Sequence, residues 1–394
     1  MLRKIEWMKK MGLTSRLVWV SVILTAALLR TASVYGASEP GGVSGGQALV
    51  ALTVPLKDIA GHWAKAAIET AVDKGYVKGY PDGTFKPGKE VTRAEFVKMA
   101  ADSLHLPVDA AAAGAKWYAP YIAALKDAGM LADSDLGAGW DGKMNRTEMA
   151  KLLTRGSDDS VRGKKLADGE ALYKAVSAGL IGGLPDGTLN EKGTMTRAEA
   201  VTVIERLATV RGGGKLTADK YALQNAAILY KGTNLEEAWG VKPVALPSLL
   251  DLDPRVDLTL NKMIIIDLDD PKSPMRSKFK GLESKTEGGM LTKDYYIIAY
   301  NFTLENKKEQ ARNMWNIFAG KIIPSISDWN YGVVYPDEKV FTHLPTIWLD
   351  EITKVNGWYL VSIRKNIAEK YPERKMPLFI TYRGTLIWLG ERNN

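Results

Sequence analysis

The stretch Thr92-Arg93-Ala94-Glu95 returns twice along the chain, as Asn145-Arg146-Thr147-Glu148 and as Thr196-Arg197-Ala198-Glu199. The three arginines lie 53 and then 51 residues apart, so the chain from about 51 to 210 consists of three repeats. In each copy a side chain that can accept a hydrogen bond is followed three positions later by Glu. This pattern is typical of a capping box, in which both side chains satisfy backbone amides at a helix start. The motif therefore predicts three helices that begin alike.

A shorter helical pattern precedes each motif and ends at a glycine. These glycines, Gly75, Gly129 and Gly179, stand 17, 16 and 17 residues before the start of the next motif. Glycine ends helices because it adopts the left-handed conformation without strain. The first and third copies also place a Pro-Asp-Gly-Thr turn between their two helices. The sequence thus predicts helix–turn–helix repeats at 51–108, 109–160 and 161–210.

Helix capping does not explain the arginine in the motif. Each Arg falls on the first helical residue, where the helix dipole disfavours a cation by ~0.3–1 kcal/mol. Pro, Glu or Asp would suit that position better. A guanidinium beside the backbone amides of a helix start is suited to an anion, because both donate to a carboxylate or phosphate. We therefore predict anion binding at Arg93, Arg146 and Arg197; a surface ion pair with a neighbouring carboxylate is the alternative.

Further candidate ligand-binding residues are Trp63, Asp82, Gly83, Asp186 and Gly187. Trp63 stands at a helix start, where it would stack on a sugar ring or pack between repeats. Asp82 and Asp186 would bond sugar hydroxyls, or would only serve the turn that Pro-Asp-Gly favours. Gly83 and Gly187 would let a ligand approach the backbone, or would only supply a positive φ.

Residues 51–210 resemble a triplet of S-layer homology domains. The resemblance is carried by Asp58, His62-Trp63-Ala64, residues 79–85 (Gly-Tyr-Pro-Asp-Gly-Thr-Phe) and the three arginine motifs. It implies an all-α, three-lobed prism with grooves between the lobes. It also implies binding of a secondary cell-wall polysaccharide that bears pyruvate ketals, with the motif arginines on the ketal carboxylate. The second repeat has no Pro-Asp-Gly-Thr turn, and we rank Arg93 and Arg197 above Arg146.

The first 37 residues have a basic start, a 13-residue apolar run at 17–29 and a stretch of small residues. This order is typical of a secretory signal peptide. A membrane anchor is the alternative, but 13 residues rise only ~20 Å as a helix, short of the ~30 Å hydrocarbon core. We expect a signal peptide at 1–37, a flexible lead-in rich in Gly and Ser at 38–50, and no membrane anchor in the mature protein.

After residue 210 the character of the sequence changes. A glycine run at 212–214 opens a connector, which we place at 211–240 with a short helix as an option. Beyond it β-branched and aromatic residues dominate, and they predict strands at 258–267, 295–304, 358–363, 378–382 and 385–389. We expect a multidomain chain in which the all-α repeats precede a β-rich, sandwich-like domain at 241–394.

The net charge of +8 favours anionic partners, and the absence of cysteine excludes a disulfide framework. The resemblance favours wall polysaccharide over nucleic acid as the partner, at the cell surface, with self-association in a surface layer as a further option. The chain has no HExxH, no Gly-x-Ser-x-Gly and no phosphate loop. We therefore expect no cofactor, no metal and no enzyme.

The alternative is a wall-anchored polysaccharide hydrolase with its site in the C-terminal domain. Glycoside hydrolysis needs two carboxylates ~5–10 Å apart across the scissile bond. Asp328 and Glu338, near Trp329, are the pair we would examine first.

Overall fold

The computed structural model describes residues 56–253, 256–279, 294–307, 314–315, 340–342, 344, 347–348, 353–366, 379–382 and 385–390. The chain divides into the units Met1–Val54 and Pro55–Asn394, and all that follows concerns the second. The predicted signal peptide and lead-in lie outside the described residues, as do Asp328 and Glu338. None of the described helices combines the length and the apolar composition that crossing a bilayer requires.

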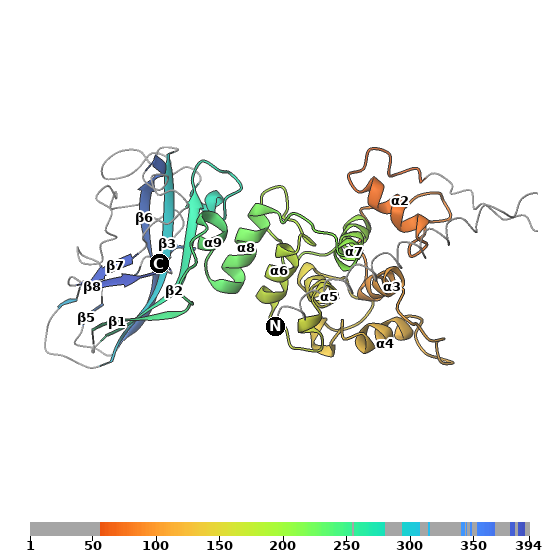
Figure 1. Ribbon diagram of the computed structural model, residues 1–394, viewed down its shortest axis with the longest axis horizontal. Helices are drawn as coiled ribbons and strands as arrows, with labels where there is room; N and C mark the ends of the chain where they lie inside the picture. The colour runs from red at the N-terminus through yellow and green to blue at the C-terminus, as the bar shows by residue number, and fades with distance from the viewer. Residues whose placement is uncertain are drawn as a thin grey trace, which may run out of the picture. The chain divides into compact units, whose positions relative to one another are not determined.

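Each repeat supplies two helices, and two more follow the third repeat (Figure 1). The helices are α2 (Lys65–Asp73), α3 (Arg93–Ser103), α4 (Ala119–Asp127), α5 (Arg146–Ser157), α6 (Asp168–Ser177), α7 (Arg197–Arg211), α8 (Lys220–Lys231) and α9 (Leu235–Trp239). Short 3-10 turns lie at η1 (Asp133–Asp135), η2 (Asp159–Val161) and η3 (Arg276–Phe279).

Local sequence decides where these helices begin and end. The helices α3, α5 and α7 each start with a complete capping box, formed by Thr92 with Glu95, Asn145 with Glu148, and Thr196 with Glu199. Gly75, Gly129 and Gly179 follow α2, α4 and α6 with φ values of 79°, 67° and 72°. Both sets of signals act within a few residues, which is why the sequence alone located them.

Three buried residues link the repeats in a closed ring of backbone hydrogen bonds. The N–H of Val91 donates to the carbonyl of Met195, that of Met195 to Met144, and that of Met144 to Val91, at 2.9, 3.0 and 3.0 Å. Each of them directly precedes a capping residue, and their side chains are fully buried. The ring therefore brings the three helix starts together. The three-lobed prism itself stays a prediction.

The segment 211–240, which the sequence suggested as a connector, contributes side chains to two hydrophobic cores. Ala222 and Ala226 of α8 belong to the hydrophobic core of the repeats, whereas Leu235 and Trp239 of α9 belong to the core beside the sheet. Between the two helices the amide of Asn234, which is fully buried, donates to the Ile265 carbonyl at 2.9 Å and accepts from the Ile265 N–H at 2.8 Å. The turn thus binds the backbone of a central strand.

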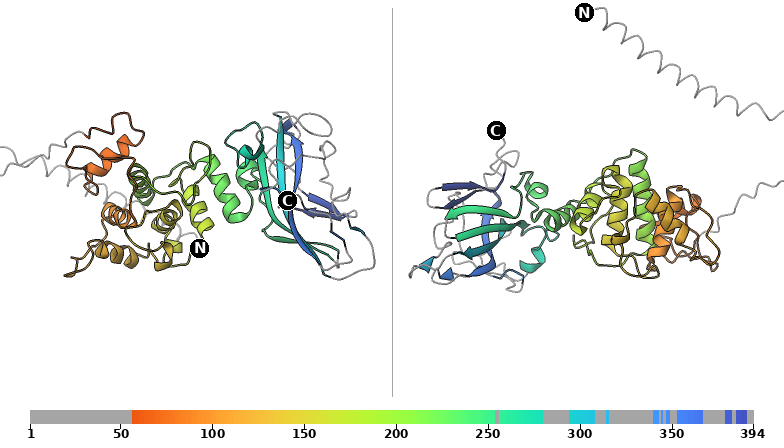
Figure 2. Two further views of the ribbon diagram at one scale, coloured as in Figure 1. Left: turned by 180° about the vertical axis from the view of Figure 1, so that it is seen from behind. Right: turned by 90° about the horizontal axis from the view of Figure 1, so that it is seen from below.

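The C-terminal part is β-rich, as predicted, and contains a four-stranded antiparallel sheet in the order β1-β2-β3-β6 (Figure 2). These strands are β1 (Ser248–Asp253), β2 (Val256–Asp267), β3 (Tyr295–Asn306) and β6 (Lys354–Arg364). Two further antiparallel pairs are β4 (Met314–Trp315) with β5 (Ile347–Trp348), and β7 (Phe379–Tyr382) with β8 (Thr385–Trp388). The sandwich arrangement stays a prediction.

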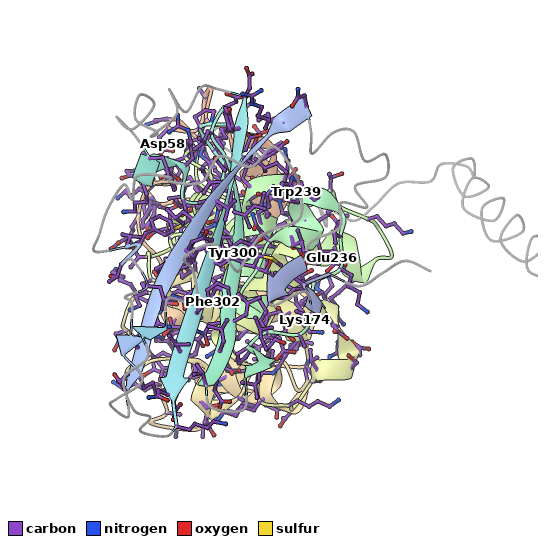
Figure 3. All side chains as sticks on the ribbon, turned by 90° about the vertical axis from the view of Figure 1, so that its left-hand side faces the viewer. Asp58, Lys174, Glu236, Trp239, Tyr300 and Phe302 are labelled. Atoms are coloured by element: carbon purple, nitrogen blue, oxygen red, sulfur yellow. The ribbon has the colours of Figure 1, made fainter. Side chains whose placement is uncertain are left out.

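Strand β3 explains how this sheet is buried on both faces. Its side chains alternate between two apolar clusters, so that Tyr300 and Phe302 lie on the face that Trp239 covers (Figure 3), and Ile297 and Ala299 on the other. The rings of Tyr300 and Phe302 stack with centroids 5.9 Å apart. A strand apolar at consecutive positions is expected where both faces are covered.

Candidate functional site

The backbone amides at the three helix starts are not free for a ligand. The first amide of each helix donates to a loop carbonyl of a neighbouring repeat; the pairs are Arg93 with Gly142, Arg146 with Gly193 and Arg197 with Lys89, at 2.9, 3.0 and 2.8 Å. The second amides donate in the same way, to the carbonyls of Trp140, Glu191 and Pro87. The premise that unpaired amides attract an anion here is therefore wrong, because the fold already satisfies them. Any anion binding depends on side chains.

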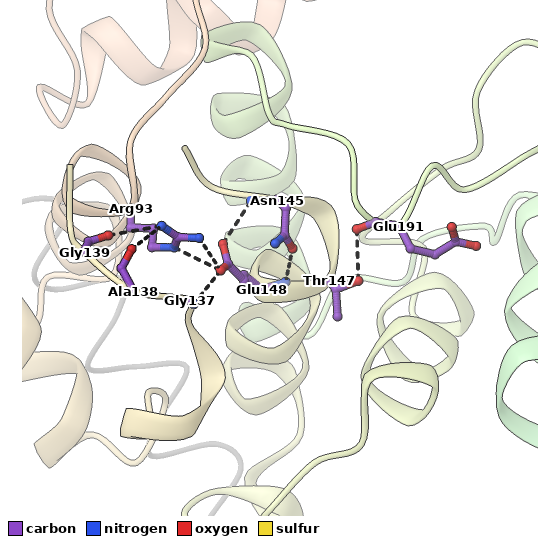
Figure 4. Close-up of polar contacts among 8 residues, drawn as sticks. All are labelled: Arg93, Gly137, Ala138, Gly139, Asn145, Thr147, Glu148 and Glu191. Atoms are coloured by element: carbon purple, nitrogen blue, oxygen red, sulfur yellow. Dashed lines mark hydrogen bonds and ion pairs between the residues drawn. The ribbon is translucent and has the colours of Figure 1, made fainter. Parts of the chain in front are cut away.

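The side chain of Arg93 is enclosed by the second repeat (Figure 4). Its Nε and Nη2 donate to Glu148 Oε1 at 2.9 and 2.7 Å, and Nη1 donates to the carbonyls of Ala138 and Gly139. Only 12% of the arginine side chain and 7% of the glutamate side chain are exposed. Arg93 therefore forms an ion pair with a neighbouring carboxylate, but a nearly buried one and not the surface ion pair that was the alternative to anion binding.

The loop of the second repeat has the residues that this enclosure needs. A Cβ at Gly142 would lie 2.1 Å from Arg93 Nη1, and a Cβ at Gly137 would lie 2.7 Å from Nη2. Glycines at both positions let the backbone close around the guanidinium.

Arg146 is more deeply buried than Arg93. Its Nη1 pairs with Glu199 at 3.2 Å and its Nη2 donates to the Gly182 carbonyl at 2.6 Å, with 7% of the side chain exposed. Burial lowers the pKa of Arg146 below its ordinary value, although Glu199 and Glu191 act in the opposite direction. A ligand at Arg146 would have to displace contacts that the fold already makes.

Arg197 differs from the other two arginines in that its described partners are carbonyls and aromatic rings. Its Nε donates to the Phe85 carbonyl at 3.0 Å and its Nη2 to the Lys78 carbonyl at 3.1 Å. Its guanidinium lies over the rings of Phe85 and Tyr80, 4.5 and 5.2 Å from their centroids. Among the described residues no carboxylate forms an ion pair with Arg197. Carbonyls and ring faces hold its positive charge in place.

Further cations surround Tyr80. Lys86 Nζ and Lys89 Nζ lie 4.2 and 5.3 Å from the centroid of the Tyr80 ring, and Lys89 also donates to the Tyr80 hydroxyl at 3.0 Å. Lys57 Nζ donates to the Asp82 carbonyl at 3.3 Å. We call this set (Lys57, Tyr80, Asp82, Lys86, Lys89 and Arg197) the Tyr80 surface. It joins side chains of the first and third repeats.

Acidic residues at the Tyr80 surface mostly hold the turn. Thr84 donates to Asp82 Oδ1 from its amide and its hydroxyl, at 3.0 and 2.6 Å, and these bonds lower the pKa of Asp82. Asp82 also pairs with Lys86 at 3.2 Å. Asp58 accepts the amides of Phe85 and Lys86 at 2.7 and 2.8 Å. Burial raises the pKa of Asp58, but the hydrogen bonds from these two amides lower it and outweigh the burial, so the net shift is downward.

The third repeat forms the same turn, and later parts of the chain pack against its glycine. Asp186 accepts from the Thr188 amide and hydroxyl at 3.0 and 2.7 Å, and the φ values of Gly83 and Gly187 are 78° and 83°. The side chain of Asn225 in α8 donates to the Gly187 carbonyl at 2.9 Å, and a Cβ at Gly187 would lie 2.6 Å from the Lys272 carbonyl. Gly187 is therefore packed against α8 and Lys272, whereas Asp186 stays exposed and, like Asp82, holds its turn.

Trp63 is largely exposed. Its side chain is 65% exposed, and its ring contact among the described residues is with His62, at 5.4 Å between centroids. Sequence reasoning singled out Asp82 and Gly83 but missed Tyr80 and the lysines around it. A usable signal was the density of lysine, five residues between positions 74 and 98. No group of three His, Cys, Asp or Glu side chains in the described part could hold a metal ion.

Comparison with known proteins identifies the repeats. The sequence model of the S-layer homology domain matches residues 55–97 and 163–201, so the chain carries S-layer homology domains, as its motifs predicted. It is 38% identical over 165 residues to the S-layer protein sap of Bacillus anthracis. The aligned region covers 37% of this chain and 20% of that protein. The S-layer protein of Bacillus thuringiensis subsp. finitimus is 37% identical over the same length and the same shares of both chains.

A shorter and closer similarity involves a cellulosome-anchoring protein of Acetivibrio thermocellus. It is 59% identical over 49 residues, which are 12% of this chain and 11% of that protein. The chain thus spans a fifth or less of the length of these relatives. The similarities indicate a protein of the bacterial cell surface.

Proposed function

We propose that the three repeats hold this protein non-covalently on the bacterial cell wall by binding an anionic wall polysaccharide at the Tyr80 surface. The observation that carries the proposal is the state of Arg197. It is a guanidinium fixed by two carbonyls and two aromatic rings, and no described carboxylate pairs with it. A cation held in place without a counter-charge attracts an anionic ligand more strongly than one that must first leave an ion pair.

The neighbouring charges support an anionic ligand. Four cations, Lys57, Lys86, Lys89 and Arg197, outnumber the two carboxylates described beside them, those of Asp82 and Asp58. The ring of Tyr80 adds a flat apolar face on which a sugar can stack while its acidic group meets the cations. We infer that this ligand is the pyruvylated secondary polysaccharide that S-layer homology domains are expected to bind, with Arg197 on the ketal carboxylate.

This proposal changes the ranking of the arginines. Sequence reasoning placed Arg93 beside Arg197, yet Arg93 and Arg146 are each paired with a carboxylate of the following repeat. We propose that these two mainly join adjacent repeats, and that Arg197 makes the principal contact with the wall polymer.

The first test concerns the polymer. We expect the purified protein to sediment with cell-wall sacculi and to stay in the supernatant after the non-peptidoglycan polymer has been removed from them, because its binding site is built for that polymer's acidic groups. The fraction that sediments, measured by gel densitometry, reports the result. Bovine serum albumin, run in parallel, measures trapping. Equal sedimentation with intact and stripped sacculi would exclude the proposal.

For the C-terminal part we propose a non-catalytic module that is displayed at the surface. The proposal rests on the sequence, which has no catalytic motif, and on the close packing of the sheet on both faces. The competing hydrolase hypothesis depends on Asp328 and Glu338. Release of reducing sugar from wall polysaccharide by the wild-type protein, and its loss in Glu338→Gln, would favour the hydrolase.

A further inference from the structure

The loops that precede α3, α5 and α7 can be aligned residue by residue through one shared hydrogen bond. The N–H of Lys89 donates to the Lys86 carbonyl; the corresponding pairs are Gly142 with Gly139 and Gly193 with Asn190, at 3.0, 3.4 and 2.8 Å. Lys89, Gly142 and Gly193 are also the residues whose carbonyls accept the first amide of a neighbouring repeat's helix. Both criteria give the same alignment. The first repeat therefore has lysine at two positions where the others have glycine or asparagine.

One of these lysines occupies an unfavourable backbone conformation. Lys86, Gly139 and Asn190 have φ values of 56°, 77° and 48°, in the left-handed region. Glycine adopts this conformation freely and asparagine tolerates it, whereas a long side chain is disfavoured there. The bond from the Lys86 amide to Asp58 holds the conformation in place. Local backbone preference does not account for lysine at this position, and such a deviation motivates a search for a function.

Both lysine side chains converge on the same ring as Arg197. The distances from the Tyr80 centroid are 4.2 Å for Lys86 Nζ, 5.3 Å for Lys89 Nζ and 5.2 Å for Arg197 Cζ. Of the two lysines, Lys86 pairs with Asp82, and Lys89 donates to the Tyr80 hydroxyl. The capping carboxylate of Glu95 also attracts Lys89, while Arg197 repels it. Asp82 balances Lys86, but among the described residues neither Lys89 nor Arg197 forms an ion pair with a carboxylate. One carboxylate bound to Arg197 would therefore leave Lys89 without an ion pair.

We propose that Lys86 and Lys89 form a second anion subsite beside Arg197, so that the Tyr80 surface binds a glycan segment with two acidic groups. Arg197 binds the first group, and the lysine pair binds the second, a carboxylate or phosphate on the same or the adjoining sugar. This inference rests on the proposed function and adds the number of charges that the ligand carries.

The double variant Lys86→Asn with Lys89→Gly tests this subsite by introducing the residues of the third repeat. Lys86→Asn suits the left-handed backbone at that position. Lys89→Gly, at a residue without a positive φ, makes the unfolded chain more flexible and acts in the opposite direction. The two effects offset each other, so we expect the melting temperature to change little. With purified wall polymer we expect binding to weaken roughly 3- to 30-fold, since two partly exposed charge contacts are lost. We also expect a weaker dependence of Kd on salt concentration. Titration calorimetry between 50 and about 300 mM salt measures both.

A matched control removes two positive charges from the other repeats. Lys116→Asn with Lys165→Gly changes two exposed lysines to the same residue types, and we expect wild-type binding. If the two double variants weaken binding equally, the effect is that of net charge alone and the subsite is excluded.

Defined sugars identify the second acidic group. The probes are a synthetic sugar with one pyruvate ketal, the same sugar extended by a uronic acid, and the same sugar extended by a phosphate ester. We expect Lys86→Asn with Lys89→Gly to leave the affinity for the first probe unchanged and to weaken one or both of the others. An equal loss for all three probes would overturn the inference. If Arg197→Ala loses binding while Lys86→Asn with Lys89→Gly binds like the wild type, the proposed function is kept and the subsite is rejected. Wild-type binding in Arg197→Ala would reject the proposed function itself.

Discussion

Replacement of Arg197 by alanine is expected to weaken binding to wall polymer by about 10- to 100-fold. A charge-assisted hydrogen bond contributes about 1.5–3 kcal/mol, and Arg197 offers an anion such bonds without first leaving a carboxylate. The variant is expected to stay folded, because the two hydrogen bonds that it loses lie at a partly exposed position. Sedimentation with sacculi over a range of protein concentrations gives the affinity, and circular dichroism reports folding.

Arg93→Ala and Arg146→Ala provide the contrast. Each leaves a nearly buried or partly buried glutamate without its cation, Glu148 and Glu199 respectively, so we expect these variants to lose stability. At temperatures where they are folded, their wall binding is expected to remain close to that of the wild type. A loss of affinity in a folded Arg93→Ala equal to that in Arg197→Ala would show that the ion pair opens to admit a ligand, and would return Arg93 to the binding site.

The second large effect is expected at the ion pair of Arg155 and Asp135 in the second repeat. Both side chains are almost completely buried, with 0% and 3% exposed. Arg155 also donates to the Lys164 carbonyl at 2.7 Å, and Asp135 accepts the Ala132 amide at 2.8 Å. Asp135→Ala leaves a buried guanidinium without a counter-charge, and we expect the free energy of unfolding to fall by about 3–5 kcal/mol. Urea denaturation followed by circular dichroism measures this change.

Asp133 is the matched control for Asp135, two residues away. It also pairs with a cation, Lys126, but 86% of its side chain is exposed. We therefore expect Asp133→Ala to change the free energy of unfolding by about 0–1 kcal/mol. Similar losses in the two variants would mean that burial does not set the strength of the Asp135 pair.

The second repeat shows where reasoning from sequence stopped. Because it lacks the Pro-Asp-Gly-Thr turn, the sequence suggested that its binding groove is weaker, and Arg146 was ranked below Arg93 and Arg197 as a ligand-binding residue. In the structure the altered loop encloses Arg93 with the help of Gly137 and Gly142, and it supplies Asp135 to a buried ion pair. Arg93 has partners that lie 45 to 55 residues further along the chain. Such partners are set by the tertiary fold, so the local sequence does not reveal them.

The sequence by itself determined the repeats, the capping boxes at the three helix starts, the glycines that end the preceding helices, and the β-rich C-terminal part. These features depend on hydrogen bonds and backbone conformations within a few residues, or on a periodic pattern, and both are written in the local sequence. The tertiary structure decided which of the three arginines forms no ion pair with a carboxylate in the part of the chain that the structure describes. Arg93 and Arg146 meet glutamates of the following repeat, whereas Arg197 meets carbonyls, Tyr80 and lysines of the first. Equivalent arginines of similar motifs thus have different charges around them, because Coulomb interactions depend on distance in space and on burial.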